Sequence, residues 1–259
     1  MSDPSQAARG ATAAKEGISW IFLLLVVVCG AAGYQLAIGR GGAIGVFVFV
    51  FVGWIISLCL HEFGHAATAW AGGDRSTAER GYLTLNPLRY ANPLMSILLP
   101  LAFLAMGGIG FPGGAVYVNR DAIRTPLWRA AMSAAGPAMN LLCLIAIGLA
   151  LSFVPMNDAL ASGLGFLGGL QASALVLNLL PIPGLDGFGI LETILPARER
   201  DALAPIARFV GLVLLVAIYA VPALFQPIWQ VAYLLCAKLG VDPYYIASGY
   251  QMFRFWDTQ

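Results

Sequence analysis

An apolar run at residues 43–60 passes directly into the sequence His-Glu-Phe-Gly-His at positions 61–65. About 20 consecutive apolar residues are enough for a helix to cross the hydrocarbon core of a bilayer, and this run is nearly that long by itself. Ionisable side chains are costly at membrane depth, so two histidines and a glutamate at the end of the run indicate a functional site. The chain is therefore expected to place a chemically active group within or just beneath a membrane.

Six apolar segments are candidates for membrane-spanning helices: residues 18–38, 43–70, 131–153, 160–180, 206–224 and 225–239. The sixth is short and contains Pro227, and the first is interpreted as an uncleaved anchor rather than a signal peptide because its apolar core is long. The chain is 59% hydrophobic and only 10% charged, with a mean hydropathy of +0.81, whereas soluble domains carry about 25% charged residues. These features predict an all-α polytopic membrane protein with about six transmembrane helices.

No stretch of the chain is polar enough to form an additional soluble domain. We therefore predict a cytoplasmic tail over residues 1–16, one membrane-embedded domain over residues 17–240 with its core at residues 43–195, and an aromatic tail over residues 241–259. Aromatic residues in such a tail are typical of a membrane interface. The formal net charge is only +1, which gives no indication of a nucleic-acid partner.

Residues 93–114 form a less regular apolar segment, in which a short run at 93–106 is followed by a stretch rich in glycine and proline. If this segment is a re-entrant hairpin and the N-terminus is cytoplasmic, every lysine and arginine except Arg40 lies on the cytoplasmic side or at its boundary. That distribution follows the positive-inside rule, and a crossing segment would break it. We therefore predict that the segment is re-entrant and lines a cavity. Residues 111–118 resemble a strand and are expected to pair with an extended peptide.

The histidines at positions 61 and 65 are four residues apart, so a helix places both imidazoles on one face with a carboxylate beside them. That geometry suits a zinc ion and the water molecule that it activates. Catalytic zinc typically takes three protein ligands, and His61 and His65 are the only histidines of the chain. The third ligand must therefore be another type of residue.

Asp186 is the best candidate for the third ligand. It follows an apolar helix that two prolines and two glycines interrupt within residues 178–187, and such a break lets a carboxylate turn towards a neighbouring helix. With residues 93–114 re-entrant, the helices that lead to His65 and to Asp186 run in the same direction and end at similar depth. As an alternative, Asp186 could cap the N-terminus of a helix that begins at Gly187.

The two motifs, in this order on two membrane helices, resemble the site-2 protease family of intramembrane zinc metalloproteases. The resemblance rests on residues 61–65 and on Asn-Leu-Leu-Pro-Ile-Pro-Gly-Leu-Asp-Gly at 178–187. Ala-Gly-Pro-Ala-Met-Asn at 135–140 is similar to the family's Gly-Pro-x-x-Asn segment, and residues 83–87 are similar to a loop of its compact bacterial and archaeal members. The resemblance covers roughly residues 53–192 and implies the compact prokaryotic type, without a PDZ or CBS domain.

The resemblance implies four site residues around one Zn²⁺ per chain: the ligands His61, His65 and Asp186, and the general base Glu62. Glu62 would take a proton from the attacking water and pass it to the leaving amine. A side-chain amide could stabilise the oxyanion that forms, and Asn178 is the first candidate and Asn140 the second. Both asparagines could instead serve helix packing, because asparagine often forms hydrogen bonds between membrane helices.

These observations predict an intramembrane zinc metalloprotease that hydrolyses peptide bonds within or near the transmembrane segments of single-span membrane proteins. The expected location is a bacterial or archaeal plasma membrane, with the active site towards the cytoplasmic side. The alternative is a divalent-metal transporter or metal-binding membrane protein that uses the same histidines and aspartate. Glu62 favours the protease, because a transport site needs no general base beside a ligand. The charged residues at 74–80 are interpreted as a solvated loop.

Overall fold

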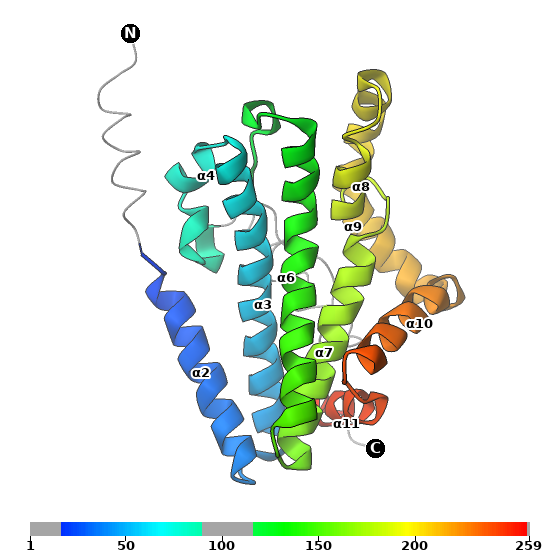
Figure 1. Cartoon of the computed structure of the whole chain (residues 1–259). Helices are drawn as coiled ribbons and strands as arrows, with labels where there is room; N and C mark the ends of the chain where they lie inside the picture. The colour runs from blue at the N-terminus through cyan, green and yellow to red at the C-terminus, as the bar shows by residue number, and fades with distance from the viewer. Residues whose placement is uncertain (1–16, 90–115, 258–259) are drawn as a thin grey trace.

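The computed structural model describes residues 17–89 and 116–257, and within these ranges every regular element is a helix (Figure 1). The longer helices are α2 (Trp20–Ala37), α3 (Gly42–Gly72), α6 (Pro126–Phe153), α7 (Asp158–Asn178), α9 (Ala197–Ala220), α10 (Pro222–Lys238) and α11 (Pro243–Phe253). The short elements are α4 (Ser76–Glu79), α8 (Asp186–Leu191) and the 3-10 turns η1 (Tyr82–Thr84), η2 (Pro87–Arg89) and η4 (Arg120–Ala122). The predicted all-α fold is confirmed.

Four of the described helices are long and apolar enough to cross a membrane, namely α2, α3, α6 and α7. The pair α10 and α11, bent by 114°, would count as a fifth span if the chain crosses through both. Helix α9 covers most of the predicted segment 206–224, which stays a prediction as a span. The chain is therefore a polytopic integral membrane protein, as its apolar segments indicated.

Helices α2, α3, α6 and α7 alternate in direction and stand side by side in a bundle (Figure 1). They share one hydrophobic core with α11, and its most buried side chains include Leu36, Leu144 and Phe253. Helices surrounded by lipid associate through close packing rather than through release of water, so small residues at their contacts matter. Gly64 on α3 is such a residue, since a Cβ atom there would lie 2.8 Å from the carbonyl oxygen of Ala135 on α6.

Two interhelical hydrogen bonds show which ends of the helices meet. The backbone N–H of Arg124, just before α6, donates to the carbonyl oxygen of Gly72 at the end of α3 at 3.0 Å. At the other end of the bundle, the Asn157 side chain before α7 donates to the carbonyl oxygen of Leu36 in α2 at 2.6 Å. Helices α3 and α7 therefore run in the same direction. The predicted hairpin at residues 93–114 lies outside the described residues, but Gly72 and Arg124 lie at one end of the bundle, as that prediction requires.

Local sequence explains where the long helices begin and end. Thr125 caps α6 by accepting a hydrogen bond from the N–H of Trp128 at 3.2 Å, and Pro126 follows in the first turn, where a missing N–H costs no helical bond. Asn157 caps α7 in the same way. Helix α3 stops where Gly73 adopts a φ of +126°, a backbone conformation that favours glycine.

One local prediction is wrong and another stays a prediction. Residues 116–118, the described part of the strand-like stretch at 111–118, form no strand within the described chain, and the N–H of Val116 donates to the carboxylate of Glu62; the pairing of this stretch with an extended peptide stays a prediction. Asp74 is not a solvated loop residue, since it is only 1% exposed and accepts hydrogen bonds from the N–H groups of Ser76 and Asn119. It ties the segment after α3 to the segment before α6. The other charged side chains of residues 74–80 are exposed, as predicted.

The aromatic segment at the C-terminal end forms α11 and a turn after it. Phe253 is buried in the core of the bundle, whereas Tyr244, Phe255 and Trp256 are exposed. This two-sided distribution is that of an amphipathic helix, which matches the interfacial role expected of the segment. The predicted domain boundaries after residues 16 and 240 stay predictions.

Candidate metal centre

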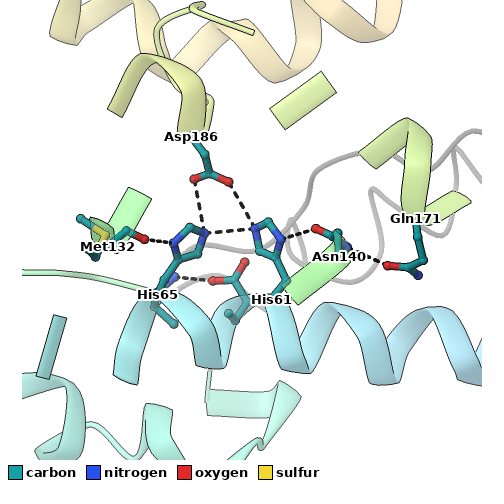
Figure 2. Close-up of polar contacts among 8 residues, drawn as sticks. His61, His65, Met132, Asn140, Gln171 and Asp186 are labelled. Atoms are coloured by element: carbon teal, nitrogen blue, oxygen red, sulfur yellow. Dashed lines mark hydrogen bonds and ion pairs between the residues drawn. The ribbon is translucent and has the colours of Figure 1, made fainter. Parts of the chain in front are cut away.

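His61 and His65 lie one turn apart on α3, with their rings turned towards each other's Nε2 atoms (Figure 2). Both residues are buried. The two Nε2 atoms are 3.1 Å apart, and the ring planes meet at 80°. Two lone pairs at this distance would repel each other, so a proton or a cation between the rings is needed to stabilise the arrangement.

Asp186 reaches the same point from a distant part of the chain. The proline- and glycine-rich turn at 179–185 ends α7, and α8 then begins at Asp186 itself. The two carboxylate oxygens lie 3.4 Å from His61 Nε2 and 3.3 Å from His65 Nε2 (Figure 2). Helix α8 has no side-chain cap bond, so the alternative role of Asp186 as a helix cap is not supported.

The three side chains fit a tetrahedral metal site. Zinc bonds of about 2.0–2.1 Å to nitrogen and oxygen ligands separate neighbouring ligand atoms by about 3.3 Å in a tetrahedron. The two histidine Nε2 atoms are 3.1 Å apart, and the two oxygens of Asp186 lie 3.3 and 3.4 Å from a different histidine each, distances close to this value. Asp186 Oδ2 is also buried without a hydrogen-bond partner among the described residues, and a buried oxygen of this kind needs another partner. The structure thus brings together a group of three residues that could hold a metal ion.

Gly136 on α6 leaves the space that an ion would need. A Cβ atom at this position would overlap His65 Nε2 and would lie 2.6 Å from His61 Nε2. Any other residue would therefore fill the point on which the ring nitrogens converge. Gly136 had no predicted role of its own, although a glycine beside a proline inside a membrane helix is a recognisable signal.

The remaining ring nitrogens contact α6. His65 Nδ1 lies 2.7 Å from the carbonyl oxygen of Met132, and His61 Nδ1 lies 2.6 Å from Asn140 Oδ1. Partners of this kind orient a ligand ring and decide which of its nitrogens carries the proton. The Asn140 amide N–H in turn donates to Gln171 at 2.8 Å. Asn140 is therefore engaged behind a histidine and does not fit its predicted role as an oxyanion donor.

Glu62 is only 2% exposed and lies beside the two histidines on α3. Its Oε2 accepts a hydrogen bond from the backbone N–H of Val116 at 3.1 Å. Its Oε1 has no hydrogen bond within the described part of the chain. One oxygen is thus held in place by a backbone donor, which suits a carboxylate that moves a proton.

Asn178 is the last residue of α7 and is 4% exposed. Its side chain has no hydrogen-bond partner among the residues that the structure describes. Gly187 in α8 lies against the turn that follows α7, since a Cβ atom there would lie 2.6 Å from the carbonyl oxygen of Leu180. Asn178 is therefore buried immediately before the turn that leads to Asp186.

Arg120 on η4 forms an ion pair with Glu192, the residue that follows α8. The pair joins the segment before α6 to the segment that carries Asp186. Partial burial lowers the pKa of the Arg120 guanidinium, and the negative charge of Asp186 acts against that shift. From the sequence, Arg120 contributed only to the positive-inside argument for topology. Its ion pair could not be predicted, because a pair between distant segments leaves no local pattern.

Apolar spans around a buried group of two histidines and an aspartate define a polytopic membrane metalloprotein. No family model and no solved structure matches the chain. "Putative zinc metalloprotease Rip2" of Mycolicibacterium smegmatis is 46% identical over 92% of this chain and 94% of its own length. The protein of the same name from Mycobacterium tuberculosis (strain H37Rv) is 48% identical over 82% of each chain. "Putative zinc metalloprotease YwhC" of Bacillus subtilis is 31% identical over 68% of this chain and 81% of its own length.

With relatives of this identity over most of its length, the chain belongs to the site-2 protease family of intramembrane zinc metalloproteases. The resemblance drawn from the two motifs is confirmed. The relatives are named as metalloproteases, and nothing in the comparisons supports the alternative of a divalent-metal transporter.

Proposed function

We propose that His61, His65 and Asp186 are the zinc ligands of this protease, and that it cuts single-span membrane proteins within or near their transmembrane segments. The observation that carries the proposal is the convergence of the three ligand groups within 4.8 Å of one another, at a buried point of a membrane bundle. A site inside such a bundle favours a substrate that is itself in the membrane. Zinc held there supplies Lewis-acid activation of a water molecule and of the scissile carbonyl group.

Glu62 is proposed as the general base. The N–H of Val116 orients the carboxylate through Oε2, and Oε1 takes a proton from the attacking water. The same oxygen then returns the proton to the leaving amine. Glu62 is adjacent to His61 in sequence, so the helix places it beside the ligand face rather than on it.

Asn178 is proposed as the side-chain donor to the oxyanion. Its burial at the end of α7, immediately before the turn that leads to Asp186, supports this role. One well-placed donor of this kind lowers the barrier to acyl transfer by about 3 kcal/mol. A turn of seven residues, 179–185, separates Asn178 from Asp186, and Gly187 lies against that turn.

We place the active site towards the cytoplasmic side of a bacterial plasma membrane. Seven residues separate His65 from the end of α3 at Gly72, which is roughly 10 Å of helix. Arg75, Arg120 and Arg124 lie at that end, whereas Arg40 lies at the other, and this asymmetry supports the orientation. The relatives named above come from bacteria.

The proposed substrate class can be tested by incubating the reconstituted protein with a panel of single-span membrane proteins. The wild type should cleave at least one of them, and mass spectrometry of the products should locate the cut within or near the span. Glu62→Gln protein, prepared in parallel, should yield no product. Cleavage confined to soluble peptides, or equal cleavage by Glu62→Gln protein, would contradict the proposal.

A further inference from the structure

The rings of the two histidines are oriented in different ways. A neutral imidazole carries one proton, and it can ligate through Nε2 only when that proton is on Nδ1. For His65 a single contact selects the tautomer with the proton on Nδ1. This nitrogen faces the carbonyl oxygen of Met132, which can only accept a hydrogen bond. For His61 the facing group is the Asn140 amide, which offers an oxygen or an NH₂ group depending on how it is turned. Another group must therefore hold Asn140 with its oxygen towards His61.

A chain of buried hydrogen bonds lies behind Asn140 (Figure 2). Asn140 Nδ2 donates to Gln171 Oε1 on α7 at 2.8 Å, and Gln171 Nε2 donates to Ser57 Oγ on α3 at 2.8 Å. The Ser57 hydroxyl donates to the carbonyl oxygen of Trp54 at 2.8 Å. Asn140, Gln171 and Ser57 are 3%, 1% and 4% exposed, so water does not compete for these bonds.

The donor and acceptor of each hydrogen bond in this series follow from its last acceptor, the carbonyl of Trp54. The carbonyl of Trp54 can only accept, so the Ser57 hydroxyl gives its single proton there and must itself accept from Gln171. Gln171 then turns its NH₂ group to Ser57 and its oxygen to Asn140. Asn140 consequently turns its oxygen to His61, which must donate from Nδ1 and keep the lone pair on Nε2.

We infer that Gln171, which has no role in the proposed mechanism, is a positioning residue of the metal centre. Through Asn140 it selects the tautomer of His61 that can bind a metal ion. The inference rests on the proposed role of His61 as a zinc ligand. A purely structural role is the competing explanation, because the same bonds join α3, α6 and α7, and buried amides often hold membrane helices together.

Gln171→Met removes the amide at similar side-chain length and releases Asn140. The zinc affinity of the full-length protein, measured by competition with a chelator, should fall about tenfold, as is common when a partner of a ligand is lost. Ser57→Ala should act in the same direction by releasing Gln171, and it decides the matter if Gln171→Met protein does not fold. Ser173→Ala is the matched control, since the Ser173 hydroxyl bonds only to carbonyls of its own helix. Ser57→Ala protein with the affinity of this control would count against the inference.

Asn140→Asp should remove the directing role of Gln171, because a carboxylate presents an acceptor to His61 whichever way it is turned. Its other oxygen can no longer donate to Gln171 Oε1, so the zinc affinity of this variant is the reference for the double variant. Adding Gln171→Met to it should lower the affinity by no more than about twofold, the usual error of additivity. If Gln171 only holds helices together, Gln171→Met will lower the affinity by the same factor in both backgrounds, and the inference is then wrong.

The chain contains only two histidines, so ring ¹⁵N spectra show two imidazoles, and His65→Ala protein identifies the signals of His61. In metal-free, full-length protein, His61 should carry its proton at Nδ1 and keep Nε2 unprotonated, with the proton between the two rings on Nε2 of His65. Gln171→Met should produce both tautomers of His61 and leave His65 unchanged. An unchanged His61 tautomer with wild-type zinc affinity would overturn the inference. Wild-type protein that binds no zinc, or His61→Ala protein that binds it fully, would instead overturn the proposed function.

Discussion

Gly136 stands opposite the two histidines, where any Cβ atom would overlap His65 Nε2. Gly136→Ala is therefore expected to abolish zinc binding, because the methyl group takes the place of the ion, while alanine itself favours the helix. Metal analysis of the purified protein and its thermal unfolding measure the two effects separately. Gly30→Ala on α2 is the matched control, since a Cβ atom there meets nothing within 4 Å. A full zinc content in Gly136→Ala protein would contradict the placement of the ion.

Replacing the general base and replacing a zinc ligand should affect zinc content and cleavage differently. Glu62→Gln is expected to keep its zinc and to lose cleavage by about 100-fold or more, because an amide cannot accept the proton of the water. Asp186→Ala is expected to lose zinc as well as cleavage, because two protein ligands hold the ion poorly. Metal content and cleavage rate are measured on the same preparations. Full zinc occupancy in Asp186→Ala protein would remove this residue from the metal centre.

The backbone N–H of Val116 orients the carboxylate of Glu62. Val116→Pro removes that donor and should lower kcat about tenfold with normal zinc content, since a general base must be held within reach of its proton. Val116→Ala keeps the N–H and serves as the control, with kcat near that of the wild type. Equal rates in the two variants would mean that Glu62 is oriented by another group.

At the scale of the helices, α8 is the element on which the site depends, because it carries Asp186 after a break in the chain. The Arg120–Glu192 ion pair holds α8 against the segment before α6. Arg120→Glu should weaken zinc binding by about threefold, a modest effect because the pair is partly exposed. The double variant Arg120→Glu with Glu192→Arg should recover most of the loss. Chelator competition on the wild type, the two single variants and the double variant gives the coupling of the two residues in zinc affinity. Strictly additive effects would show that the pair does not position α8.

At the scale of the whole molecule, α3 and α7 run in the same direction. The histidines on α3 and Asp186 after α7 therefore lie towards the same end of the bundle. Cysteine labelling from either side of the membrane, in protein whose four native cysteines are replaced, tests this arrangement. Cysteines placed at Asp121 and Arg198 should react from the cytoplasmic side, and cysteines at Arg40 and Asn157 from the other side. Labels at Asp121 and Arg198 from opposite sides would contradict both the topology and the shared metal centre.

Much of this architecture could be predicted because the signals are local. A bilayer demands about 20 apolar residues in a span, and most of the predicted segments coincide with helices of suitable length. The spacing of His61 and His65 places both rings on one face of any helix, whatever surrounds it. The strand-like stretch at residues 111–118 cannot be assigned from the sequence alone, because a strand needs a partner and pairing is not a property of the segment. Asp74 was misread for the same reason, since its hydrogen-bond partner Asn119 lies far along the chain.

By itself, the sequence determined the membrane class of the protein, most of its helical segments and three side chains suited to a metal ion. These follow from hydropathy, charge and helical period, which are read within a few turns of chain. Only the tertiary structure shows that Asn140 faces His61, that Gly136 leaves space beside the two ring nitrogens, and that Gln171 bonds to Asn140. Each of these roles depends on the direction of a hydrogen bond or on a contact of a few ångströms between different helices, and such relations exist only once the helices have packed.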